Sequence, residues 1–208
     1  SGTLHPRDMT ITFHRFPYTL EKVRGTIAFD REGLELKTVT GRRGQAEAAI
    51  TGTVADTPDN VPFDVTVTAS DLPLDEALRK ALPKNISYPT VWEDFGPSGR
   101  LGKAVARVWH HEGGKEHAEV LLVFDGRAAA TFHRFPYRLE NLTGEVKVGR
   151  DVHIEGVTAR HGKAEVDLAG TITAPGTDRE AVSLGVKVRD LPLDDAFRAA
   201  LRTEARQM

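Results

Sequence analysis

The chain has 208 residues, 28% of them charged, and a formal net charge of −2 at pH 7. This balance leaves no excess of positive charge for nucleic-acid binding, and the lack of cysteine excludes disulfides and thiolate metal sites. No sequence run approaches the roughly 18 apolar residues of a transmembrane helix, and no signal peptide is recognisable.

Two strings occur twice in the sequence at the same spacing. FHRFPY at 13–18 recurs 119 residues later at 132–137, and DLPLD at 71–75 recurs at 190–194. A fixed period indicates a repeat protein. We therefore assign residues 1–84 to the C-terminal part of a first repeat and 85–203 to a complete second repeat. We expect a slice of a longer array, with Ser1-Gly2 as a remnant of tag removal.

Alternation of apolar and polar residues, the period of a half-buried strand, runs through most of both repeats. Asp30–Gly33 has the composition of a hairpin turn, and Arg43-Gly44 and His161-Gly162 supply further turns. Pro17 should end a strand near Phe16 or place it at an edge. Five strands per repeat, joined by short turns, predict an antiparallel meander. In chain order the predicted strands include 9–16, 26–29, 34–39, 46–54, 63–69, 99–110, 117–132, 164–172 and 182–188.

The alternation slips by one residue at the same place in both repeats. After Leu36 the next apolar residue is Val39, and after Ile154 it is Val157. The slip predicts either a β-bulge or the end of a strand. A second ambiguity lies at Asp125-Gly126, where residues 117–132 form either one long bent strand or two strands.

A helical period follows the DLPLD string of each repeat and predicts one short amphipathic helix there. Pro73 and Pro192 suit a first helical turn, and the acidic residues after them suit the helix dipole. Residues 85–98 read as a crossing loop that could hold one helical turn. The apolar residues of the two helices, which could gate or merely cover a groove, are Leu74, Leu78, Leu82, Leu193, Phe197 and Leu201.

Nearly every predicted strand has one apolar and one hydrophilic face, and the apolar face must be buried against something. A β-sandwich would supply a second sheet. The many small residues on the apolar faces, and the repetition itself, instead favour one curved antiparallel sheet, a half-tube with an apolar concave face. Its lining would be Ile27, Phe29, Leu36, Ile50, Val54, Val65, Val67, Leu122, Phe124, Val146, Val148, Val166, Leu168, Leu184 and Val186.

The order FPYxLE, GLxL, GxA, GT and DLPLDxAL, followed by PSGRL, resembles the repeats of AsmA-like and TamB-related proteins, the bridge-like lipid transfer group. These motifs run through most of both repeats. The resemblance implies a repeating β-groove in a periplasmic parent that is anchored at the inner membrane. It also implies phospholipid or another acyl lipid as the cargo and neighbouring repeats of the same parent as partners. Membrane contact would lie outside this slice.

No catalytic constellation is recognisable, and we expect neither enzymatic activity nor a cofactor. His110, His111 and His117 cluster at a hairpin and could bind a metal, but solvated hairpin ends are the simpler interpretation. His14 and His133 should lie on the surface. The Phe-Pro-Tyr strings are interpreted as structural turns, although they could dock a partner. Capping or turn chemistry accounts for Asp71 and Asp75.

The function expected from these features is a non-enzymatic segment of a lipid-transport bridge, whose apolar groove carries acyl chains between membranes. The alternative is a β-sandwich scaffold or binding module of a large repeat protein with no lipid conduit.

Overall fold

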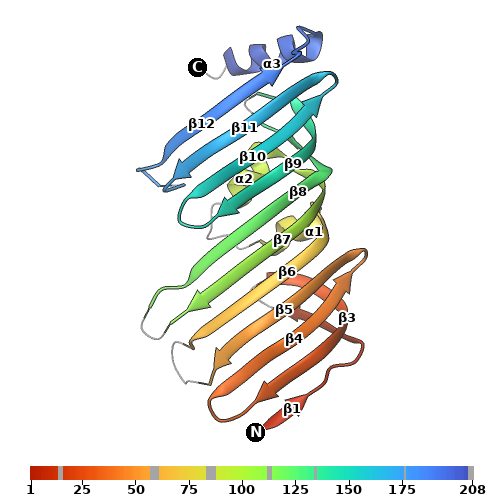
Figure 1. Cartoon of the computed structure of the whole chain (residues 1–208), viewed down its shortest axis with the longest axis vertical. Helices are drawn as coiled ribbons and strands as arrows, with labels where there is room; N and C mark the ends of the chain where they lie inside the picture. The colour runs from red at the N-terminus through yellow and green to blue at the C-terminus, as the bar shows by residue number, and fades with distance from the viewer. Residues whose placement is uncertain are drawn as a thin grey trace. The chain divides into compact units, whose positions relative to one another are not determined.

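The computed structural model describes residues 1–13, 16–56, 61–82, 88–111, 114–133, 135–175 and 177–205. Strand is the predominant secondary structure of the described residues. Twelve strands form one antiparallel sheet that is not closed, and consecutive strands are neighbours from β3 to β12 (Figure 1). The predicted mainly-β class is therefore confirmed.

The first strands depart from this simple order, because β1 and β2 both pair with β3. The strands are β1 (Gly2–Leu4), β2 (Met9–Phe13), β3 (Phe16–Phe29), β4 (Gly33–Arg43), β5 (Ala46–Ala55), β6 (Phe63–Pro73), β7 (Ser98–His110), β8 (His117–Thr131), β9 (Arg138–Val148), β10 (Val152–His161), β11 (Ala164–Thr173) and β12 (Ala181–Arg189). The helices are α1 (Glu76–Ala81), α2 (Tyr88–Phe95) and α3 (Asp195–Ala205).

The chain divides into two compact units. Unit 1 comprises residues 1–72 and 103–122, and unit 2 comprises residues 73–102 and 123–208. The strands β7 and β8 each contribute residues to both units. Unit 1 otherwise holds β1 to β6, and unit 2 holds β9 to β12 together with the three helices.

The β-bulge interpretation of the phase slip is confirmed in both units. The pairing of β4 with β5 shifts register between Leu36 and Val39, and that of β10 with β11 shifts between Ile154 and Val157. The bulge absorbs the extra residue, so that the apolar side chains on either side of it stay on the same face. Residues 117–131 form the single strand β8, with Gly126 at φ 91°.

Other backbone irregularities also recur at equivalent positions. Lys22 and Asn141 have φ values of 51° and 54°, and Asp71 and Asp190 have values of 52° and 50°. Positive φ is uncommon for residues other than glycine. Its recurrence indicates that the two halves of the sequence bend the chain in the same way.

The hairpin turns are those that the sequence indicates. Asp30 Oδ1 accepts hydrogen bonds from the backbone N–H groups of Glu32 at 2.8 Å and Gly33 at 3.3 Å, an arrangement that stabilises the β3–β4 turn. Gly44 and Gly162 have φ values of 58° and 57° at the β4–β5 and β10–β11 turns, where only glycine adopts the conformation without strain.

The predicted short helices are present, but their first residues differ from the prediction. The N-cap of α1 is Asp75, whose carboxylate accepts from the Leu78 N–H at 2.9 Å. Asp194 accepts from the Phe197 N–H of α3 at 2.9 Å. Pro73 is the last residue of β6, so its placement in the first helical turn was wrong. The α2 helix has eight residues where the sequence suggested at most one turn.

The two FHRFPY strings adopt different structures. In the first repeat, β2 ends at Phe13 and β3 begins at Phe16, and these two residues pair. His14 and Arg15 lie outside the described residues. In the second repeat β8 ends at Thr131 and β9 begins only at Arg138, so the string lies between strands. The strand predicted to end near Phe16 ends at Phe13 instead, and Pro17 stands inside the next strand, at its second position.

Candidate functional site

The registers of unit 1 place apolar residues opposite one another in continuous rows. In one row Phe29 pairs with Leu34, Leu34 with Val54, and Val54 with Phe63. Residues directly opposite in an antiparallel pair point to the same face of the sheet. The next rows along the strands are Leu4–Ile27–Leu36–Gly52–Val65 and Gly25–Val39–Ile50–Val67.

Unit 2 repeats this arrangement. Val148 pairs with Val152, Val152 with Ile172, and Ile172 with Val182. The further rows are Val146–Ile154–Gly170–Leu184, Val157–Leu168–Val186 and Ala159–Val166–Val188. Each unit therefore has one predominantly apolar face, built from equivalent residues in the same order. We call these surfaces the apolar face of unit 1 and the apolar face of unit 2.

The fifteen predicted lining residues are divided between the two units. Eight lie in unit 1 and seven in unit 2. Val166 is buried, with 6% of its surface exposed, whereas Phe29 and Val186 are 50% and 56% exposed. Leu184 is also exposed. The half-buried remainder are Ile27, Leu36, Ile50, Val54, Val65, Val67, Leu122, Phe124, Val146, Val148 and Leu168.

Several members of the rows were missing from the predicted lining. They include Leu34 and Phe63 in unit 1 and Val152, Ile154 and Ile172 in unit 2. These residues follow the same apolar–polar alternation as the predicted lining residues. Applying the alternation to every residue of each strand, and continuing it across the bulge, would have included them in the lining.

The opposite face carries polar and charged residues. Lys147 Nζ lies 3.0 Å from Glu155, and Arg160 Nη2 lies 2.8 Å from Glu165. The hydroxyls of Thr143 and Thr158, on neighbouring strands, are 2.7 Å apart. Exposed ion pairs of this kind stabilise a protein only slightly. They keep this face hydrated, so the two faces of each unit differ sharply in polarity.

Two carboxylates have lowered pKa values because of neighbouring guanidinium groups. Arg107 donates to both oxygens of Asp64, at 3.0 and 2.6 Å, and this hydrogen bonding lowers the pKa of Asp64 and raises that of Arg107. Arg127 in the same way lowers the pKa of Asp125. Both pairs are largely exposed, and both hold charges that are already neutralised. Neither pair therefore has the features of an acid–base centre.

A small core in unit 2 shows how the helical segments meet the sheet. Leu74, which precedes α1, packs against a buried cluster of Ala128, Leu142 and Ala159. Ala159 belongs to a row of the apolar face of unit 2, so Leu74 covers part of that face.

The other predicted helix residues differ widely in exposure. Leu78 is buried, and Leu82 is the half-buried C-cap of α1. Phe197 contacts the rings of Phe135 and Tyr137, with both centroids at 6.0 Å. Leu193, 67% exposed, precedes α3, and Leu201 is also exposed. The α3 helix therefore packs through Phe197 against the segment that precedes β9, while Leu193 and Leu201 stay at the surface.

The Phe-Pro-Tyr strings pack their tyrosines beside basic or imidazole side chains. The Arg43 guanidinium lies 4.8 Å from the centroid of the Tyr18 ring, and His161 lies 3.9 Å from Tyr137 at the equivalent place. Both tyrosines are buried. This arrangement agrees with the structural interpretation of the strings, although the ring partners Arg43 and His161 were not foreseen.

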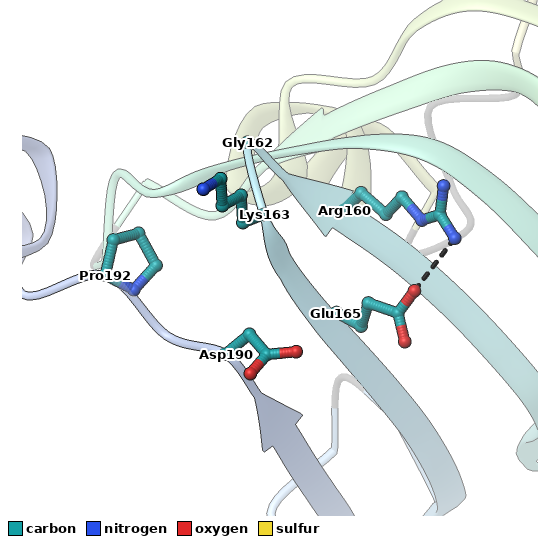
Figure 2. A pocket seen from close by; sticks show the side chains of 6 residues that line it. All are labelled: Arg160, Gly162, Lys163, Glu165, Asp190 and Pro192. Carbon is teal, nitrogen blue, oxygen red and sulfur yellow. Dashed lines mark hydrogen bonds and ion pairs between the residues drawn. The ribbon is translucent and has the colours of Figure 1, made fainter.

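Two open cavities lie at the ends of strands. One, of about 720 Å³ in unit 1, is lined by the end row Phe29, Leu34, Val54 and Phe63 together with charged residues of the turns. The other, of about 690 Å³ in unit 2, lies at the β10–β11 turn and the end of β12 (Figure 2). Four of its six lining residues are charged: Arg160, Lys163, Glu165 and Asp190.

The histidines give no metal centre within the described part of the chain, where no group of three or more histidine, aspartate or glutamate side chains could hold an ion. His110 is buried, with 8% exposed, and its ring lies 6.0 Å from Phe63. The interpretation of His110 as a solvated hairpin end was therefore wrong. His111 and His117 are exposed, as is His133, whose Nδ1 lies 3.2 Å from Asp94.

No protein-family model, curated protein or solved structure matches this chain. Among the described helices, none has both the length and the apolar character needed to cross a membrane.

Proposed function

We propose that this chain is a non-enzymatic lipid-conducting segment, in which the apolar face of each unit lines a groove for the acyl chains of phospholipids. The observation that carries the proposal is the set of apolar rows, which run across β3 to β6 in unit 1 and across β9 to β12 in unit 2. The resemblance of the repeats to the bridge-like lipid transfer group adds to it.

The exposure of the rows supports a ligand on this face. Most of the lining side chains are half-buried, and Phe29, Leu34, Leu184 and Val186 are exposed. Soluble proteins rarely leave contiguous apolar patches of more than a few hundred Å² in water without a binding role. Acyl chains would remove this surface from water at a gain of about 25 cal/mol per Å².

Transport along such a face needs no bond making. An acyl chain that moves along a row from one strand to the next exchanges one apolar environment for another, so the free energy changes little at each step. Headgroups would travel at an open side of the groove.

The alternative of a closed β-sandwich scaffold requires a second sheet packed about 10 Å from the first. Every strand in the described ranges belongs to the same sheet. This single sheet favours the groove over the sandwich. A scaffold whose apolar faces bind another protein would differ from a lipid groove in what co-purifies with the chain: a protein instead of phospholipid.

Photocrosslinking tests the proposal. A photoreactive amino acid at position 168, on the apolar face of unit 2, should crosslink to phospholipid that co-purifies with the protein. The matched control is position 165 on the same strand, where the Glu165 side chain points to the opposite face and meets Arg160. Equal crosslinking from both positions would contradict a lipid groove.

A further inference from the structure

The apolar face of unit 2 is open at one end of its strands and closed at the other. In β9, β10 and β11 the residues of the end row are half-buried: Val148, Val152 and Ile172. Toward the other ends of the same strands the apolar residues are buried, with at most 9% of their surface exposed: Leu142, Ala159 and Ala164. A ligand can therefore approach this face from the side of the end row.

The open end lies beside two charged connections. Asp151, between β9 and β10, accepts a hydrogen bond at 3.0 Å from the backbone N–H of Ala174, between β11 and β12, so both connections lie at this end. They also carry the exposed side chains of Arg150, Asp178 and Arg179. Charges of both signs in water suit a phospholipid headgroup, whereas the apolar rows would desolvate it at a high cost.

The closed end is covered by Leu74. Its side chain packs against Ala128, Leu142 and Ala159, and Ala159 belongs to the last of the four rows. The backbone N–H of Leu74 donates to the Gly99 carbonyl at 3.0 Å. The next residue, Asp75, is the N-cap of α1. The backbone is thus held at Leu74 and directly after it, so the side chain stays in place at the end of the rows.

The distance from the open end to Leu74 matches the length of one acyl chain. Along β11 the register is unbroken from Val166 to Ile172, six residue steps that span about 20 Å at about 3.3 Å each. The hydrocarbon core of a bilayer is about 30 Å thick, so the acyl chains of one leaflet extend about 15 Å, and a fully extended chain reaches further. One acyl chain laid along the strands therefore fills this face.

We propose that Leu74 sets the length of the acyl chain that the apolar face of unit 2 accepts, with the headgroup at the open end and the methyl end of the chain against Leu74. This inference rests on the proposed lipid groove and adds to it a direction and a length limit. A shorter chain leaves part of the rows uncovered, and a longer one cannot pass Leu74. Each methylene that fits the face changes the binding equilibrium roughly fourfold.

Competition between single-chain lipids tests the proposal on the intact chain. The protein is incubated with equimolar myristoyl, palmitoyl, stearoyl and arachidoyl lysophosphatidylcholine, and native mass spectrometry measures the share of each in the bound lipid. Leu74→Ala shortens the side chain and should raise the ratio of longer to shorter acyl chains by roughly three- to tenfold. Leu74→Phe extends the side chain toward the rows and should lower the same ratio.

Two further variants are controls. Leu193→Ala truncates the equivalent leucine of the second DLPLD string, which is 67% exposed, and should leave the ratio unchanged. Leu184→Glu places a charge in the rows of unit 2, and in this background Leu74→Ala should no longer change the ratio.

The outcomes separate this inference from the lipid groove on which it rests. Absence of bound lysolipid from the wild type would overturn both. Bound lysolipid with the same chain-length profile in the wild type and in both Leu74 variants, or a shift in the same direction in both variants, would overturn the length limit alone.

Discussion

The tyrosine of the second FHRFPY string carries a buried hydroxyl. The Tyr137 side chain is 6% exposed, and its hydroxyl has no hydrogen-bond partner among the described residues. Burial, with a smaller contribution from the charge of Asp194, raises the pKa of this tyrosine. A buried polar group without a partner costs free energy, whereas the ring contributes its contacts with His161 and Phe197.

We predict that Tyr137→Phe leaves the free energy of unfolding unchanged or raises it by about 1 kcal/mol. Because the folded-state pKa is raised, the tyrosine's contribution to stability is complete below its ordinary pKa of about 10 and is lost as pH rises toward the folded value. The variant should therefore lose less stability than the wild type above about pH 10. Urea titrations at pH 7 and pH 10.5 measure both effects.

The control is Tyr137→Ala, which removes the ring as well and should cost about 3 kcal/mol. A loss of similar size in Tyr137→Phe would mean that the hydroxyl has a partner after all.

A glycine of β5 approaches its neighbouring strand too closely for a side chain. Gly52 has φ 148°, and an added Cβ would collide with the backbone carbonyl of Asp64. Gly52→Ala should lower the free energy of unfolding by about 2–3 kcal/mol. In β12, the nearest heavy atom to an added Cβ at Gly185 is 3.6 Å away. Gly185→Ala should therefore change stability little, and thermal melts compare the two. Equal losses would contradict the close-approach argument.

At the scale of the element, the short helix α1 depends on its cap. Asp75 satisfies the Leu78 N–H, and the helix has only six residues. Asp75→Ala should cost about 1 kcal/mol, because one donor of the first turn loses its partner. Asp75→Asn keeps an acceptor oxygen and should cost much less. Chemical denaturation of both variants provides the measurement, and equal losses would show that the carboxylate's charge, not its capping bond, is what matters.

The features that were predictable from the sequence depend on a few neighbouring residues. One displaced apolar residue in each repeat indicated a bulge or a strand end, and the structure has the bulge. Asp30, Gly44 and Gly162 indicated the turns, because a turn needs a specific backbone conformation. The two FHRFPY strings show the limit. The identical string is strand-like around Phe16 and lies between strands around Phe135, so tertiary context decides its conformation. Pro73 similarly fits the end of a strand as well as the start of a helix.

At the scale of the whole molecule, the lipid proposal predicts that the amount of phospholipid bound per chain depends on the apolar face of each unit and not on the opposite face. Leu184 and Ser183 are exposed neighbours in β12, and the pleat directs them to opposite faces. Leu184→Glu should reduce the phospholipid recovered per chain severalfold, since a charge in the apolar row is costly to cover with an acyl chain. Native mass spectrometry with lipid extraction measures this ratio.

Ser183→Glu is the matched control and should leave the ratio unchanged. Circular dichroism of both variants tests that the strand content is intact. An equal loss of lipid in the two variants would indicate that charge alone, and not its position on the apolar face, controls binding.

The alternation of residues predicted that each strand has an apolar face but left open what lies against it. A second sheet and a bound ligand would both cover valine and isoleucine side chains, so the sequence pattern is the same in either case. The single sheet of twelve strands favours a ligand over a second sheet. The rows were therefore predictable from residues such as Ile50 and Leu168, whereas the boundaries of the two compact units, which cut through β7 and β8, were not.

The turns between equivalent strands differ in length while the rows stay aligned. Four residues separate Phe29 from its partner Leu34, but only three separate Val148 from Val152. The two turns thus differ by one residue, and the apolar side chains on either side of each turn still face the same way. A one-residue insertion within a strand would reverse the orientation of every residue after it. Evolutionary insertions and deletions in this chain should consequently concentrate at hairpin ends, where duplication and drift can proceed without disturbing the surface between them.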